Sequence, residues 1–310
     1  MDETFPLIAV GMTLYWPENL EPFLRERVCA TFKHPEDVLL QTDRELARSL
    51  GISITSARLV LSTIAGMFAP TPMSALNLYE SRDVLSVGLP SLDTALGGGL
   101  RKNWLVEIVG EAGSGKTQWA LTIASQLLLK KGTVYWIDTE NTFRPDRMLQ
   151  MLHGDQESLS SLLVRRCHSL SELLDSFTEL CSIVNADDTG VSTLIVLDSL
   201  AAVARVHASP AIDRTEVIHR LARLAKRTSA VTVVTNHVST EMKTSKPDLR
   251  ATLGNTWAHD VTCRFWLNMQ QNPFRQRCLT VSKAPNIDNS IPFMLHVRIE
   301  SNGIQETGMN

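Results

Sequence analysis

Eight consecutive residues of the chain have the types and spacing that bind the phosphates of a nucleotide. They fit the pattern Gly-x4-Gly-Lys-Ser/Thr. Glycines let successive backbone N–H groups turn inward without a Cβ clash, and a helix that begins at the end of the loop adds its positive dipole end there. The sequence therefore predicts a phosphate-binding loop, which consists of Gly110, Glu111, Ala112, Gly113, Ser114, Gly115, Lys116 and Thr117.

Three side chains have the chemistry to hold a nucleoside triphosphate and magnesium. Lys116 can reach the β- and γ-phosphates as a point charge, and the hydroxyl of Thr117 is placed to ligate Mg²⁺. Asp198 ends the apolar run 194–197. In folds that carry such a loop, an acid at this kind of strand end holds the magnesium shell, so Asp198 is the candidate Walker B residue.

Glu140 is the candidate general base. It follows the run 133–138, whose end is expected at the carboxyl edge of a parallel sheet, where nucleotides bind. A carboxylate at that place can orient and deprotonate the water that attacks the γ-phosphorus. The alternative is a simple acid favoured by the positive end of a helix that begins near Asp146.

Apolar runs predict the elements that must position these residues. Strands are expected at 105–109, 133–138, 194–197 and 231–235, and a helix is expected at 118–129. Helix-length segments separate these runs, which is the pattern of a mostly parallel, doubly wound α/β sheet. Later runs follow one another too closely for crossover helices, so the sheet is predicted to finish with antiparallel strands at 261–267, 277–281 and 293–299, with a hairpin turn at Asn302-Gly303.

The length indicates two units. The 310 residues, 44% of them hydrophobic, suffice for one α/β domain of about 200 residues and a smaller unit. Residues 1–68 are predicted to form a small helical domain, since Thr42-x-x-Glu45 is a capping box and Gly51 can end a helix. The prolines and polar residues of 69–87 indicate a linker, and 88–310 remain for the nucleotide-binding core.

Charge and cysteine content narrow the class of protein. A net charge of −3 supplies no polybasic coat, so any contact with nucleic acid must come from local patches. The five cysteines form neither a C-x-x-C pair nor a Cys/His cluster with zinc spacing, which fits a reducing compartment. No apolar run reaches the ~18 residues that span a bilayer. We expect a soluble intracellular protein with no membrane partner.

Several motifs of the second unit belong together. They are Gly88-Leu89-Pro90-Ser91-Leu92-Asp93, the loop with Gln118 directly after it, Asp138-Thr139-Glu140, Thr142-Phe143-Arg144-Pro145-Asp146-Arg147 and Thr235-Asn236-His237. These motifs resemble those of the RecA/RadA family of recombinases, and the eukaryotic branch is the most similar. The resemblance covers residues 88–310, and it implies a RecA-like core that binds ATP and Mg²⁺ between protomers and binds DNA along two loops. The first 68 residues resemble that branch's helix-hairpin-helix domain more loosely.

The resemblance implies a role for each matching position. Glu140 corresponds to the family's catalytic glutamate, Asp198 to its Walker B acid, and Arg147 to the arginine that stacks on adenine. Asn236 and His237 occupy a strand-end pair that is usually Asn-Gln, whose glutamine links the γ-phosphate to the second DNA loop. An imidazole can donate a hydrogen bond to phosphate, but its reach is shorter and its charge depends on pH.

Further residues resemble the family's paralog branch, the accessory proteins of homologous recombination. Residues 72–75 read Pro-Met-Ser-Ala, without the aromatic anchor of the Phe-x-x-Ala polymerisation motif. Residues 282–285 carry Lys283 where the recombinase has an aspartate, and 253–259 also match the paralogs. The resemblance implies that Lys283 and Pro285 cap the ATP of a neighbouring chain. The alternative for Lys283 is a surface residue after a strand.

DNA contact is predicted at Arg205 and within 238–252. The second segment holds Lys243, Lys246 and Arg250 against two acids, an excess of one positive charge, and the expected partner is single-stranded or branched DNA. A solvated surface loop is the alternative.

Three functions are open. The first is a nuclear, DNA-dependent ATPase that assists homologous recombination in a complex with other paralogs. The second is a mainly structural subunit whose ATP joins chains with little turnover. The two differ in whether Glu140 acts as a general base. The third, a small-molecule kinase on the same loop, is disfavoured because no arginine-rich lid follows 194–198 and the helical N-terminal unit is left without a role.

Overall fold

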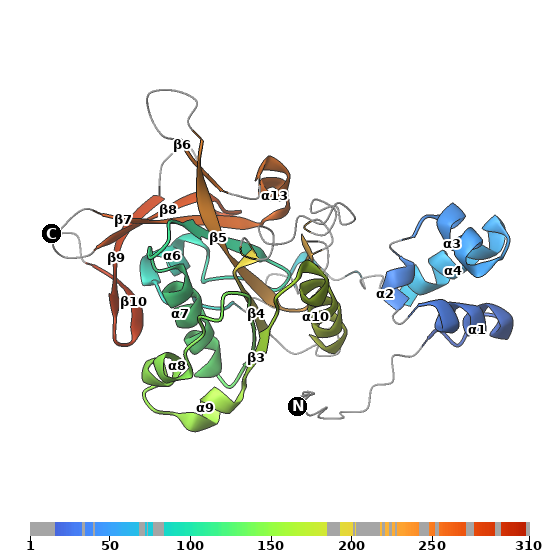
Figure 1. The fold of residues 1–310 in the computed structure, drawn as a ribbon, viewed down its shortest axis with the longest axis horizontal. Helices are drawn as coiled ribbons and strands as arrows, with labels where there is room; N and C mark the ends of the chain where they lie inside the picture. The colour runs from blue at the N-terminus through green and yellow to red at the C-terminus, as the bar shows by residue number, and fades with distance from the viewer. Residues whose placement is uncertain are drawn as a thin grey trace. The chain divides into compact units, whose positions relative to one another are not determined.

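The computed structural model describes most of the chain after residue 15, and these residues divide into two units, Met1–Leu78 and Tyr79–Asn310 (Figure 1). The division falls inside the predicted linker 69–87. The described residues are 16–32, 35–39, 41–67, 72, 74–76, 84–184, 193–200, 202, 218, 221–222, 225–226, 228–241, 248–251, 254–270, 276–288 and 293–307.

The first unit is helical, with α1 (Pro22–Thr31), α2 (Pro35–Val38), α3 (Asp43–Leu50) and α4 (Ile54–Met67). The capping box at Thr42 is confirmed. The Glu45 backbone N–H donates to the Thr42 hydroxyl, and the Thr42 backbone N–H donates to the Glu45 carboxylate. Gly51 ends α3 in the left-handed conformation, as predicted, with φ 61°. Taken singly, no described helix is long and apolar enough to span a membrane, and only α3 with α4, bent by 109°, meets the length and composition test.

The second unit is built on one sheet, to which ten described strands contribute in the order β10-β9-β8-β7-β1-β5-β4-β2-β3, with β6 paired to β5. Strands β7, β1, β5, β4, β2 and β3 run parallel, whereas β8, β9 and β10 are antiparallel to their neighbours. The predicted α/β class is therefore confirmed. The bounds are β1 (Leu105–Gly110), β2 (Thr133–Asp138), β3 (Leu162–Arg166), β4 (Thr193–Asp198), β5 (Val231–Glu241), β6 (Asp248–Ala251), β7 (Cys263–Met269), β8 (Arg277–Lys283), β9 (Phe293–Glu300) and β10 (Gly303–Glu306).

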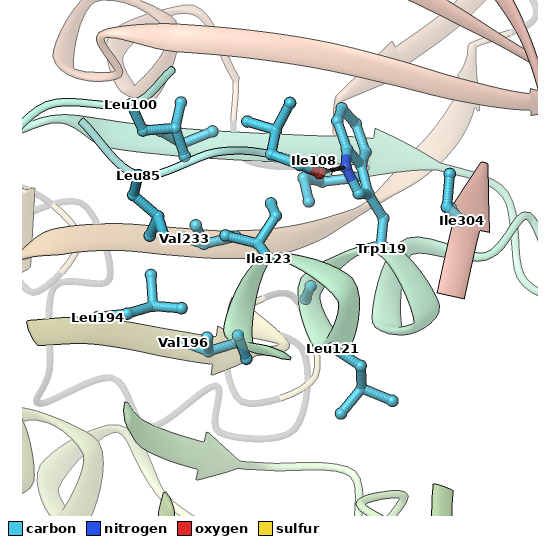
Figure 2. Close-up of a cluster of buried hydrophobic side chains, with 14 of the residues drawn as sticks. Leu85, Leu100, Ile108, Trp119, Leu121, Ile123, Leu194, Val196, Val233 and Ile304 are labelled. Atoms are coloured by element: carbon cyan, nitrogen blue, oxygen red, sulfur yellow. Dashed lines mark hydrogen bonds between the residues drawn. The ribbon is translucent and has the colours of Figure 1, made fainter. Parts of the chain in front are cut away.

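Helices cover both faces of this sheet. Figure 1 shows α7, α8 and α9 on one face and α10 on the other, and a separate apolar cluster fills each side. In Figure 2, Trp119 and Ile123 of α7 point toward Ile108 and Val233 of the sheet. The helix that leaves the phosphate loop is thus fixed by burial. The helices are α6 (Pro90–Ala95), α7 (Lys116–Leu128), α8 (Pro145–Met151), α9 (Gln156–Ser160), α10 (Leu170–Val184) and α13 (Gly254–Asp260).

The core begins earlier than the sequence analysis placed it. Leu85 and Val87 are buried among the core residues of the second unit, although the prediction assigned them to the linker. The indole N–H of Trp119 donates to the Val87 carbonyl at 3.0 Å, which is the dashed line in Figure 2. A buried indole needs a partner for its N–H, and this contact ties the residues before Gly88 to α7.

The described residues of the segment 238–252 form strands, where a loop was one of the predictions. Strand β5 continues to Glu241 and pairs antiparallel with β6, from Val238 opposite Ala251 to Glu241 opposite Asp248. Strands β3 and β10 were also missed. All three missed strands are four or five residues long and carry charged or polar side chains, so their apolar pattern is weak.

A buried carboxylate lies in the middle of β1. Glu107 has no exposed surface, and its carboxylate accepts hydrogen bonds from Asn236 at 2.7 Å, from Trp257 at 2.7 Å and from Arg264. These donors come from β5, α13 and β7. A charge without water is tolerated only when it is paired and hydrogen-bonded, so Glu107 fixes these elements relative to the strand that enters the phosphate loop.

We predict that Glu107→Ala destabilises the core by about 3–5 kcal/mol, because it leaves the partly buried Arg264 guanidinium without its carboxylate. Glu157→Ala is the matched control, since Glu157 pairs with Lys131 on the surface, where such pairs contribute about 0–1 kcal/mol. Urea unfolding measures both. Equal losses in the two variants would contradict the assignment of Glu107.

Candidate nucleotide-binding site

The phosphate loop begins at the carboxyl end of β1, between β5 and β7. A Cβ at Gly110 would lie 2.4 Å from the Leu267 carbonyl oxygen, and one at Gly115 would lie 2.9 Å from the Ile299 side chain. Gly113 and Gly115 have φ of +76° and +109°. Only glycine fits these places, so the loop has the closely packed cradle that the sequence motif requires.

Lys116 holds a positive charge against this loop. Its side chain is buried, and its ammonium donates to the carbonyls of Gly110 at 3.0 Å and Glu111 at 2.8 Å. Lys116 is the first residue of α7, whose positive dipole end is at the same place. The charge, the dipole end and the glycine cradle together suit a polyphosphate.

Thr117 and Asp198 meet directly beneath the loop. The Thr117 hydroxyl donates to the Asp198 carboxylate at 2.8 Å, and Thr235 donates to the other carboxylate oxygen. Burial raises the pKa of Asp198, against the effect of these hydrogen bonds. Hydroxyl and carboxylate oxygens are the donors that Mg²⁺ prefers, and the described residues contain no group of three or more His, Cys, Asp or Glu that could bind a metal. The pair therefore fits a magnesium ion that shares nucleotide oxygens and water.

Glu140 and His237 are brought into contact. The His237 Nε2 lies 3.0 Å from a Glu140 carboxylate oxygen, which also accepts a hydrogen bond from the Ser199 hydroxyl. The hydrogen bond from His237 is the main cause that lowers the pKa of Glu140 to about 2, against the effect of burial, and the Ser199 bond and the charges of His237 and Lys116 add to it. A carboxylate with so low a pKa is a weak base.

The ends of β2 and β4 hold Glu140 in place. The buried Asp138 accepts hydrogen bonds from the backbone N–H groups of residues 140, 142 and 143. The Thr139 hydroxyl donates to the Ser199 carbonyl at 2.7 Å and accepts from its N–H at 2.8 Å, and the Asp198–Ser199 peptide is cis. Ser199 was missed by the sequence analysis, and its place directly after Asp198 at a strand end was the available signal.

Arg147 and Gln118 lie together at another side of the loop. The Arg147 Nε donates to Gln118 at 2.8 Å, and its two terminal nitrogens donate to the carbonyls of Glu300 and Ser301 at 2.6 Å. Burial lowers the pKa of Arg147. The arginine thus joins α7 and α8 to the turn between β9 and β10, and its predicted stacking on adenine stays a prediction.

Asn236 binds inside the sheet. Its side chain is fully buried and its amide nitrogen donates to Glu107. This contact fixes the part of β5 that carries His237, and the predicted contact of Asn236 with the nucleotide stays a prediction. Arg205, Lys243 and Lys246 lie outside the described residues. Arg250 belongs to β6, and its side chain is not described.

Lys283 has partners within its own chain. Its ammonium donates to the carbonyls of Ala258 at 3.0 Å and His259 at 3.2 Å, at the C-terminal end of α13. A cation at this end of a helix satisfies orphan carbonyls and complements the dipole. Pro285 is exposed in the loop that follows β8. The contact of both residues with a neighbour's nucleotide stays a prediction.

Comparison with known proteins assigns the chain to a family. The model of the Rad51 family matches residues 82–307. The chain belongs to the Rad51 family. The recognition of a recombinase paralog from the sequence is confirmed by this match and by the relatives described next.

This Rad51-family chain is similar to proteins called DNA repair protein RAD51 homolog 4 and homolog 3. It is 29% identical over 277 residues to homolog 4 of Bos taurus, covering 81% of the chain and 83% of the relative. It is 27% identical to homolog 4 of Mus musculus, over 94% of each, and 26% identical to homolog 3 of Cricetulus griseus, over 89% of the chain and 88% of the relative. The crystal structure of the RadB recombinase matches with a TM-score of 0.59 and 25% identity, covering 73% of this chain and all of that one.

We predict that His237→Ala raises the pKa of Glu140 from about 2 toward the ordinary 4.5, because the main hydrogen bond to the carboxylate is lost. Since the folded pKa is the lower one, the stabilisation by Glu140 is present above pH 4.5 and is lost as the pH falls toward 2. Carboxyl ¹³C NMR measures the titration. His296→Ala, which removes an exposed imidazole bound to Gln270, is the control. An unchanged titration in His237→Ala would contradict the pairing.

Proposed function

We propose that this chain is a nuclear, ATP-binding paralog that assists homologous recombination and double-strand break repair, with weak DNA-dependent ATP hydrolysis. The observation that carries the proposal is the Thr117–Asp198 contact under a loop that holds Lys116, because it supplies phosphate and magnesium ligands together. Its relatives are named DNA repair proteins, which supports the proposed role in homologous recombination.

Each residue of the site has a distinct role in this proposal. Lys116 and the loop N–H groups bind the β- and γ-phosphates, and Thr117 with Asp198 holds Mg²⁺, which neutralises phosphate charge when bound. Gln118 accepts a hydrogen bond from Arg147 and so keeps this arginine beside the loop. There Arg147 contacts the base of the nucleotide.

Glu140 orients the attacking water and accepts its proton, and His237 limits how well it does so. A base works best when its pKa lies near the operating pH, and the contacts from His237 and Ser199 hold the pKa of Glu140 at about 2. We therefore expect slow turnover. The same contact favours a second candidate, a structural subunit in which ATP joins two chains and is rarely hydrolysed.

Partners and DNA are part of the proposal. Strand β3 lies at one end of the described sheet, where Leu163 is 37% exposed, and an edge strand of this kind can accept a strand from another paralog. Single-stranded or branched DNA is proposed to contact Arg205, Lys243, Lys246 and Arg250, which belong to segments that follow the nucleotide-bearing strands β4 and β5.

We predict that Lys116→Ala lowers the affinity for Mg²⁺–ATP more than tenfold, because it removes the cation at the phosphates, and that Glu140→Gln keeps the affinity while slowing DNA-stimulated hydrolysis at least tenfold. These magnitudes are order-of-magnitude values for a phosphate-binding lysine and a general base, where a base contributes about 10²–10⁴-fold. Equilibrium binding and steady-state hydrolysis assays measure them.

The matched control is Lys131→Ala, which removes a surface lysine beyond the other end of α7. ATP binding by Lys116→Ala at the level of Lys131→Ala would contradict the site. Equal rates of hydrolysis in the wild type and Glu140→Gln would show that Glu140 is not the general base. If neither protein hydrolyses ATP although both bind it, the structural subunit is supported.

We also predict that ATP strengthens the binding of a partner paralog relative to ADP, and that Lys283→Ala abolishes this preference. An ammonium beside the γ-phosphate of a neighbouring chain favours the triphosphate. Lys226→Ala is the control, because Lys226 is a nearby lysine paired with Asp260. Since Lys283 also caps α13, thermal unfolding of the isolated variant separates loss of stability from loss of preference. An ATP preference that survives Lys283→Ala shows that Lys283 serves α13 alone.

A further inference from the structure

An arginine from outside the loop motif contacts the phosphate loop. Arg277 is the first residue of β8, and its Nε–H donates to the carbonyl oxygen of Ser114 at 3.2 Å. Because β8 runs antiparallel to β7, Arg277 lies opposite Met269, the last residue of β7. It is therefore at the same edge of the sheet as the end of β1, although 163 residues separate it from Ser114.

The Ser114 carbonyl and the Gly115 N–H belong to the same peptide unit. A trans peptide is planar, and its C=O and N–H groups point in opposite directions. A donor that holds the Ser114 carbonyl therefore directs the N–H of Gly115 away from Arg277. Gly115 precedes Lys116, and its N–H is one of those that a phosphate-binding loop aims at the anion. The arginine thus fixes the orientation of a backbone N–H that binds the ligand.

The other described contacts of the loop do not involve the Ser114 carbonyl. Lys116 donates to the carbonyls of Gly110 and Glu111, at the beginning of the loop. Ser114 is fully buried, its N–H donates to Glu111, and its hydroxyl has no hydrogen-bond partner among the described residues. The left-handed φ of +109° at Gly115 also permits this peptide to turn, since glycine has no Cβ to restrain it. An external donor is needed to hold it in one orientation.

We propose that Arg277 is a positioning residue for nucleotide binding, which orients the Ser114–Gly115 peptide so that the Gly115 N–H faces the phosphates of a nucleoside triphosphate. This inference rests on the proposed nucleotide site. The guanidinium also adds a positive charge next to the loop, in the region where the phosphate charge is bound. An arginine suits this place because its charge is permanent and its N–H groups have fixed directions.

Two substitutions and one control test the proposal. Arg277→Gln removes the charge and the Nε–H donor, and Arg277→Lys keeps the charge. Arg165→Gln is the control, because Arg165 lies on β3 at the other edge of the sheet, paired with Glu179 on the surface. We expect Arg277→Gln to weaken Mg²⁺–ATP binding about tenfold, as for loss of a charge-assisted hydrogen bond, with Arg277→Lys intermediate and Arg165→Gln unchanged. The melting temperature of the nucleotide-free protein should stay close to the wild-type value.

A spectroscopic measurement examines the contact itself. In the nucleotide-free protein, the amide ¹⁵N and ¹H resonances of Gly115 should shift in Arg277→Gln, because the carbonyl of the same peptide loses its donor, and should not shift in Arg165→Gln. Equal ATP affinity in the two glutamine variants, equal losses in Arg277→Gln and Arg277→Lys, or an unmoved Gly115 resonance would each overturn the proposal. If the wild type itself fails to bind ATP, the proposed function is wrong, and the Gly115 resonance then tests whether Arg277 orients the peptide. Should Arg277→Gln not fold, Arg277→Lys supplies both measurements.

Discussion

The close approach of Gly110 to β7 is the constraint on which the nucleotide site depends. A Cβ at this position would lie 2.4 Å from the Leu267 carbonyl, so the loop can leave β1 only because the residue is glycine. At Gly115, φ is +109° and an added Cβ would lie 2.9 Å from the Ile299 side chain of β9. Strands β7 and β9, with β8 between them, therefore form the wall against which the loop packs. Arg277 of β8 and the β9–β10 turn held by Arg147 belong to this wall.

The buried carboxylate of Glu107 extends this arrangement below the loop. It lies three residues before Gly110 and binds side chains from β5, α13 and β7. One of them, Asn236, directly precedes His237, which contacts Glu140. Strand β1, which enters the phosphate loop, and the part of β5 that faces Glu140 are thus joined through one carboxylate. Removal of any of these donors would leave a buried charge with too few partners.

The sequence predicted the sheet and the glycine turn at 110–115 well for a physical reason. The buried parallel strands are mostly apolar runs, and the glycines of the loop stand where a Cβ would clash or where φ is positive. Strands β3 and β6 escaped prediction because Arg165, Arg166, Asp248 and Arg250 interrupt their apolar pattern. The resemblance supplied candidate roles for Glu140 and His237, but their contact depends on how β2 and β5 are spaced across β4, which a linear pattern does not contain. Arg277 was missed for the same reason, since only the register of β8 places it at the loop.

We propose that one Mg²⁺–nucleotide complex binds where Thr117 and Asp198 meet. Mn²⁺ replaces Mg²⁺ at oxygen ligands and is visible by electron paramagnetic resonance, so titration of Mn²⁺–ATP into the purified chain tests the claim directly. We expect one bound Mn²⁺ per chain, which appears only with ATP and is lost in Thr117→Val. Binding that is absent from the wild type, or that survives unchanged in Thr117→Val, would contradict it.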